Sequence, residues 1–210
     1  MKSIGLLIMR LALGMLMAGH GSQKLFGWWS GPGLKGTHGF MEMLGMRPGK
    51  VWGTMAAVGE TSGGVLTVLG FLSPVGPLNI ASAMAVAIRR VHWKTPVWAS
   101  EGGAELPLTN MAAATALALA GPGRYSLDRA FGLRMPRWLV ALAWLNTIAI
   151  TAAAILRPEV AETVVEKATS VVPGTLHATS DPDIEVETRQ VTTPSDAGSE
   201  RTPSQSGAEL

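Results

Sequence analysis

The chain contains no cysteine among its 210 residues. This absence excludes disulfide bonds, thiol catalysis and metal sites built on cysteine. Charged residues are also scarce, at 15% of the chain, whereas soluble domains carry about 25%. With 47% hydrophobic residues and a mean hydropathy of +0.27, the composition favours a membrane protein over an alanine-rich soluble helical protein.

Acidic residues are rare in the first three quarters of the chain. Only five of the fifteen acids, but fourteen of the seventeen lysines and arginines, precede Pro158, so the net charge is +9 before that residue and −7 from it onward. The second part is rich in Thr, Ser and Pro and shows little apolar periodicity. We therefore expect residues 158–210 to form a disordered acidic tail, with a short helix over 160–172 left open.

Five apolar segments occupy residues 3–22, 51–72, 76–91, 107–120 and 138–156. A helix needs about 20 apolar residues to cross a membrane. The first segment also resembles a cleavable signal sequence, but Arg10 in its middle argues against removal. The pattern predicts an all-α, polytopic membrane helical bundle.

Glycines and aromatic residues fill the stretch between the first two segments. Residues 25–50 include the adjacent Trp28 and Trp29, and tryptophan prefers the membrane interface. This stretch is expected to lie along one membrane surface, with a short helix over 39–44. In the second segment, Gly59 and Gly63 form a small-xxx-small pair that favours close backbone approach between helices.

Charged and imidazole side chains interrupt the first apolar segment. Arg10, Leu13, Met17, His20 and Lys24 recur at steps of three and four residues, which places them on one face of a helix. An arginine inside the hydrocarbon layer costs about 3 kcal/mol or more. We therefore expect this face to look inward, with an ion pair as the main role of Arg10.

Antiparallel packing of the segments brings polar side chains from four helices to one side of the membrane. Glu60 is expected about 12 Å below that surface, as the counter-ion of Arg10 or Lys24 or as a proton relay. Paired charges offset one another's desolvation, and imidazoles carry protons near neutral pH. The residues predicted to line one cavity are His20, Lys24, Glu60, Arg89, His92 and Glu105.

Histidine is the residue type to consider for a metal or haem site, but the spacing of the histidines near the predicted cavity does not indicate one. His20 and His92 fall on separate helices, without a His-x-x-x-His or Glu-x-x-His pattern. Such spacing gives no diagnostic metal or haem site. Neither a metal nor haem is therefore expected.

An ordered series of motifs resembles the DoxX family of small bacterial membrane proteins. The motifs are residues 10–14 (RLALG), 20–27 (HGSQKLFG), 31–33 (GPG), Glu60 with Gly63-Gly64, Gly102-Gly103 with Glu105 and Pro107, and 121–128 (GPGRYSLD). The resemblance covers about residues 3–130 and implies a four-helix membrane bundle. The family is related to DoxD, a subunit of thiosulfate:quinone oxidoreductase and of a terminal quinol oxidase.

The resemblance divides the chain into three parts. Residues 1–130 are expected to form the DoxX-like four-helix bundle, 131–157 a basic loop and an extra transmembrane helix, and 158–210 the acidic tail. The fifth segment and the tail depart from the family pattern. The expected location is the bacterial cytoplasmic (inner) membrane, with several passes.

The resemblance implies a quinone- or quinol-interacting oxidoreductase subunit. His20, Glu60 and His92 would handle protons, and Lys24 or Arg89 would orient a ring oxygen. Arg10, Gln23 and Glu105 would complete the polar cavity. Electrons would pass through a bound quinone or a partner subunit.

Two other functions stay open. One is a non-catalytic scaffold that docks a soluble redox enzyme through the basic loop or the acidic tail. The other is a small-solute permease, which is weakened because five spans show no evident inverted repeat. The expected partners are the lipid bilayer and a soluble or membrane redox protein, and no nucleic acid is expected.

Overall fold

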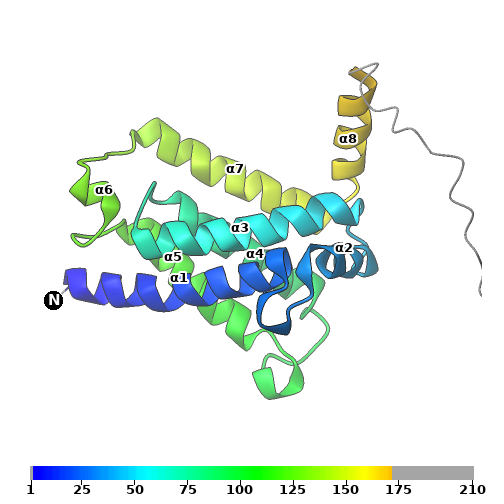
Figure 1. Cartoon of the computed structure of the whole chain (residues 1–210), viewed down its shortest axis with the longest axis horizontal. Helices are drawn as coiled ribbons and strands as arrows, with labels where there is room; N and C mark the ends of the chain where they lie inside the picture. The colour runs from blue at the N-terminus through cyan, green and yellow to red at the C-terminus, as the bar shows by residue number, and fades with distance from the viewer. Residues whose placement is uncertain (1, 172–210) are drawn as a thin grey trace, which may run out of the picture. The chain divides into compact units, whose positions relative to one another are not determined.

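The computed structural model describes residues 2–171, which contain only helices and their connections (Figure 1). This confirms the predicted all-α fold. The α-helices are α1 (Lys2–Phe26), α2 (Gly33–Met43), α3 (Gly49–Leu69), α4 (Val75–Arg90), α5 (Glu105–Ala120), α6 (Leu127–Ala130), α7 (Arg137–Leu156) and α8 (Val160–Val171), with short 3₁₀ turns at Trp28–Ser30 and Ala99–Glu101.

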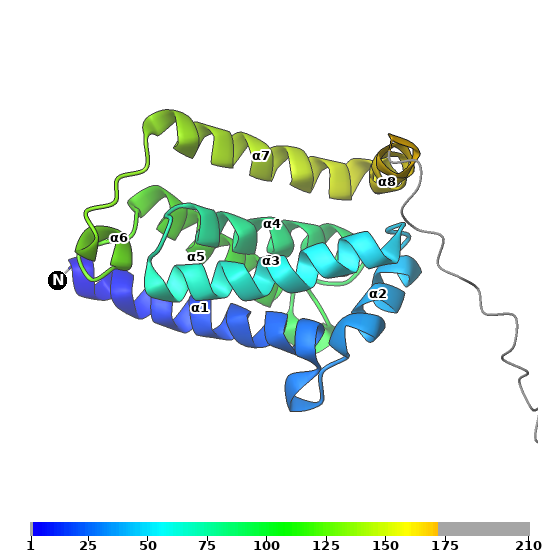
Figure 2. The same ribbon diagram turned by 45° about the horizontal axis from the view of Figure 1, so that its top comes forward.

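Helices α1, α3, α4 and α5 pack side by side as a bundle, as Figures 1 and 2 show. Helix α3 contacts both α1 and α4, and α4 in turn contacts α5. Leu13, Met17, Ile80, Met84 and Leu117 form the centre of the core and are nearly inaccessible. Helix α2 contacts both α1 and α3 near the turn that joins them, and it is longer than the predicted helix over 39–44.

Glycines allow α1 and α3 to pack backbone against backbone. A Cβ atom on Gly14 would lie 2.8 Å from the carbonyl oxygen of Gly64, and one on Gly64 would lie 2.6 Å from that of Gly14. The predicted Gly59–Gly63 pair holds only in part. Gly63 approaches the carbonyl oxygen of Gly76 on α4, whereas nothing lies within 4 Å of a Cβ built on Gly59.

Helix α7 stands beside the bundle and contacts it mainly through α4 (Figure 2), and its Ala154 also packs with Met41, Met46 and Trp52. Its outward face carries large exposed apolar side chains, including Leu145 and Ile148. The hydroxyls of Ser82 on α4 and Thr151 on α7 are 2.7 Å apart. Arg90 donates hydrogen bonds to the carbonyl oxygens at the end of α7, so α7 is attached mainly along its second half.

Two helices in the described part of the chain, α1 and α7, are long and apolar enough to cross a membrane. Of the five predicted segments, therefore, only the first and the fifth form helices that combine the length and the hydropathy needed to cross a membrane. Helices α4 and α5 have 16 residues each, or about 24 Å. Proline and arginine residues bound α4 on its two sides, and the loop motif before α5 shortens the fourth segment.

A helix also follows α7, where the acidic tail was predicted to begin. Helix α8 matches the short helix left open over 160–172, so this part of the predicted tail is helical. Trp52 donates a 2.8 Å hydrogen bond from its indole nitrogen to the carbonyl of Pro158, just before this helix. The remainder of the predicted tail, residues 172–210, lies outside the described residues.

Candidate functional site

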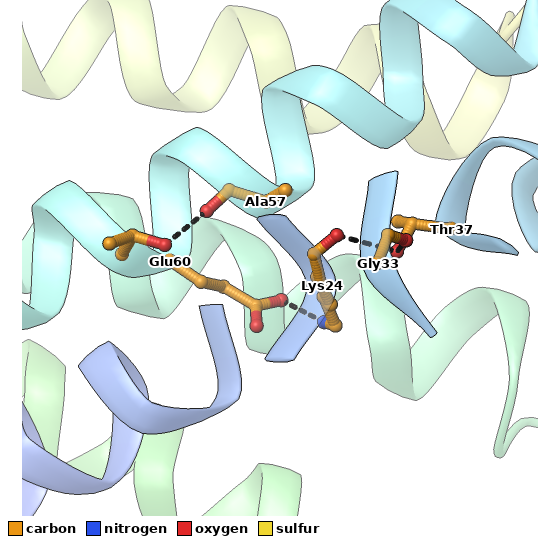
Figure 3. A network of polar contacts seen from close by, with 6 residues as sticks. Lys24, Gly33, Thr37, Ala57 and Glu60 are labelled. Carbon is orange, nitrogen blue, oxygen red and sulfur yellow. Dashed lines mark hydrogen bonds and ion pairs between the residues drawn. The ribbon is translucent and has the colours of Figure 1, made fainter. Parts of the chain in front are cut away.

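An ion pair between Lys24 and Glu60 joins the last turn of α1 to the middle of α3 (Figure 3). Glu60 is buried, and Lys24 is half-buried. The hydroxyl of Thr37 on α2 donates to the carbonyl oxygens of Lys24 (3.2 Å) and Gly33 (2.8 Å). The structure therefore selects Lys24, of the two predicted alternatives, as the partner of Glu60.

Both members of this pair line a cavity of about 480 Å³. Small-molecule sites typically enclose about 300–1,000 Å³. Helices α2, α3, α4 and α7 supply most of the lining, which is largely apolar. The apolar part includes Phe40, Met41, Trp52, Met55, Val58, Val86 and Ile150, and the polar part includes Thr54, Ser62, Asn79, Ser82, Arg90, Asn146 and Thr147.

His20 does not line this cavity, contrary to the prediction. The buried face of α1 is centred on Met17 and Gly21, and successive helical residues point about 100° apart. His20 therefore lies at the edge of that face and is exposed. Gln23 also lies outside the cavity, since it packs against Gly31 in the following loop.

Arg89 is another predicted cavity residue that the structure places outside. Its guanidinium carbon lies 5.4 Å from the centre of the Trp93 ring, in a cation–π arrangement. The adjacent Arg90 lines the cavity instead and donates to the Ala154 carbonyl oxygen at 2.9 Å. Sequence reasoning missed this role because either arginine could have faced inward.

His92 and Glu105 organise the loop between α4 and α5 rather than the cavity. His92 Nδ1 lies 2.7 Å from the carbonyl oxygen of Gly102. The Glu105 carboxylate accepts a 2.9 Å hydrogen bond from the backbone N–H of Ala99. These contacts within residues 92–105 hold the loop against itself, so the predicted placement of both side chains in the cavity was wrong.

Arg10 is buried at the other end of the bundle and binds backbone carbonyl groups. It donates to Thr67 (2.9 Å) and Val68 (2.7 Å) at the end of α3, and to Pro122 (2.6 Å) and Tyr125 (2.7 Å). Carbonyl groups at a helix C-terminus lack partners within the helix. Arg10 forms no ion pair within the described residues, so the predicted ion pair was wrong, although the arginine does face inward.

Asp128 holds the turn after α3, a structural role that sequence reasoning missed. Its two carboxylate oxygens accept hydrogen bonds from the backbone N–H groups of Leu72 and Ser73, each at 2.9 Å. Its own N–H donates to the carbonyl oxygen of Gly70. Motif 121–128 therefore closes the turn between α3 and α4. A single acid in an otherwise basic loop was the available signal.

The described residues contain no preformed cluster of metal ligands. Across residues 2–171, no three His, Asp or Glu side chains are grouped in a way that could hold an ion. The ion pair and the cavity beside it are therefore the main candidate site. The chemistry they offer is hydrogen bonding, proton exchange and enclosure of an apolar molecule.

Comparison with known proteins identifies one family. The family model named DoxX matches residues 5–93, which include nearly all of α1 and the whole of α2, α3 and α4. No curated protein and no solved structure matches the chain. The match covers Lys24 and Glu60 but ends before α5 and α7. Residues 5–93 therefore carry the pattern of the DoxX family, and this match together with the apolar helices indicates a helical membrane protein.

Proposed function

We propose that this protein binds a quinone or quinol in the cavity beside Lys24 and Glu60, as an oxidoreductase subunit of the bacterial cytoplasmic membrane. The observation that carries the proposal is a charged pair set into the wall of a mainly apolar cavity of about 480 Å³. We further propose that the bundle crosses the membrane several times.

The chemistry of the lining suits a hydrophobic ring with oxygen substituents. Met, Val and aromatic side chains offer an apolar surface to the ring and its tail. The Lys24 ammonium can donate a hydrogen bond to a ring oxygen, and the Glu60 carboxylate can accept a proton from a ring hydroxyl. In this proposal a partner protein transfers the electrons. Of the residues first considered for proton transfer, Glu60 alone keeps that role.

The test is quinone extraction and mass analysis from gently purified protein. Wild type is expected to retain quinone, and Glu60→Gln is expected to lose most of it because the charged pair is removed. His20→Ala is the matched control, since His20 lies outside the cavity, and it should retain quinone. Absence of quinone from wild type would overturn the proposal and favour the scaffold function.

The absence of natural cysteine allows the binding place to be mapped directly. Thr147→Cys places one thiol in the cavity wall, whereas Ile148→Cys places one on the outward face of the same helix. A short-chain ubiquinone should slow maleimide labelling of the first variant and leave the second unchanged. Equal labelling of both variants with and without ubiquinone would contradict binding at this cavity.

A further inference from the structure

The cavity has a second polar region, away from the ion pair. Asn79 on α4 and Asn146 on α7 both line the cavity, on the two helices that the Ser82–Thr151 hydroxyl contact joins. A Cβ atom on Gly63 would lie 3.0 Å from Cβ of Asn79, so Asn79 is level with Gly63. Glu60 lies three residues earlier on the same helix, or about 4.5 Å along its axis.

Neither carboxamide makes a hydrogen bond to any residue within 2–171. Other polar side chains of the cavity differ in this respect. Ser82 is bonded to Thr151, and Ser62 donates to the Val58 carbonyl oxygen of its own helix. A side-chain amide offers two donors and two acceptor positions, so these carboxamides, half-buried in Asn79 and exposed in Asn146, are open to a ligand.

The other charged group of the cavity is distant from this region. Arg90 lies eleven residues after Asn79 on α4, or about 16 Å along the helix, and its guanidinium binds the end of α7. Apart from the Lys24–Glu60 pair about one helical turn away, the cavity residues around Asn79 and Asn146 are therefore uncharged. This environment disfavours an ionic ligand group there and accepts a neutral one.

We infer that Asn79 and Asn146 form a second binding point, which holds an oxygen of an uncharged, lipid-soluble ring compound whose other oxygen faces Lys24 and Glu60. The inference rests on the proposed function, because it uses the same cavity. A carboxamide donates to a carbonyl oxygen and accepts from a hydroxyl, so it serves both the oxidised and the reduced ring. Along the α3 axis, the level of Asn79 differs from that of Glu60 by about one helical turn, or about 4.5 Å, so one compact ring compound can reach both.

One of the two asparagines lies outside the residues that match the family model. Residues 5–93 include Asn79, whereas Asn146 belongs to α7. Helix α7 therefore does more than add a membrane segment, because it completes the ligand site. The selectivity of this protein for its ligand depends on α7.

The test measures binding of a short-chain ubiquinone to purified wild type and to Asn146→Leu. Leucine has a similar size but no hydrogen-bonding group, and loss of one hydrogen bond predicts about a five- to tenfold weaker affinity. Asn79→Leu should have a similar effect. Asn110→Leu, on α5 and outside the cavity, is the matched control and should bind like wild type.

The outcomes separate the inference from the proposed function. Unchanged affinity in Asn146→Leu would overturn the inference while ubiquinone binding by wild type sustained the proposed function. Failure of wild type itself to bind would overturn both. Asn146 is exposed on α7, so Asn146→Leu should keep the thermal stability of wild type. Its ubiquinone affinity therefore tests the inference even if Asn79→Leu misfolds.

Discussion

Lys24 and Glu60, thirty-six residues apart in the chain, form an ion pair that links α1 to α3. The pairing follows from the antiparallel contact of the two helices, in which Gly14 meets Gly64 and Gly21 meets Thr61. The same contact places the pair in the wall of the cavity. The packing of α1 against α3 therefore both stabilises the buried Glu60 carboxylate and gives the cavity its charged groups.

Removing one member of the pair should cost more stability than removing both. Lys24→Met leaves the buried Glu60 carboxylate without a counter-ion, and we expect a loss of about 1–3 kcal/mol. Adding Glu60→Gln to this variant should recover part of that loss. Thermal unfolding in detergent of the single and double variants measures the coupling, and strictly additive losses would contradict it.

Replacement of Arg10 should destabilise the bundle without changing the cavity. Arg10→Leu leaves four carbonyl groups without their donor, with an expected cost of about 3 kcal/mol or more. Arg10→Lys should restore only part of the stability, because an ammonium cannot reproduce the guanidinium fork. The measurement is the melting temperature in detergent. Equal melting temperatures for all three proteins would show that these hydrogen bonds contribute nothing.

Two glycines of α3 should respond differently to the same substitution. Gly64→Ala inserts a methyl group into the contact with α1, and overpacking of this kind costs about 1–3 kcal/mol. Gly59→Ala adds a methyl group where nothing lies within 4 Å, so its stability should match or exceed that of wild type. Their melting temperatures are compared side by side. If Gly64→Ala has the same melting temperature as wild type, the close approach of α1 and α3 is refuted.

The sequence by itself determined the helices and the need for partners. Apolar runs bounded by proline, glycine and charged residues predicted α1, α3, α4, α5 and α7 close to their observed limits, because helix formation depends on local periodicity. The presence of Arg10 and Glu60 within apolar runs also required inward faces. The motifs within residues 10–64 indicated the family whose model matches residues 5–93.

Only the tertiary structure decided which partner each polar side chain meets. Arg10 binds carbonyl groups and leaves Glu60 to Lys24, Arg90 rather than Arg89 lines the cavity, and His20 turns outward. Adjacent helical residues point about 100° apart, so each of these outcomes depends on the rotation of a helix about its axis. That rotation is set by contacts between segments far apart in the chain, which local periodicity does not specify.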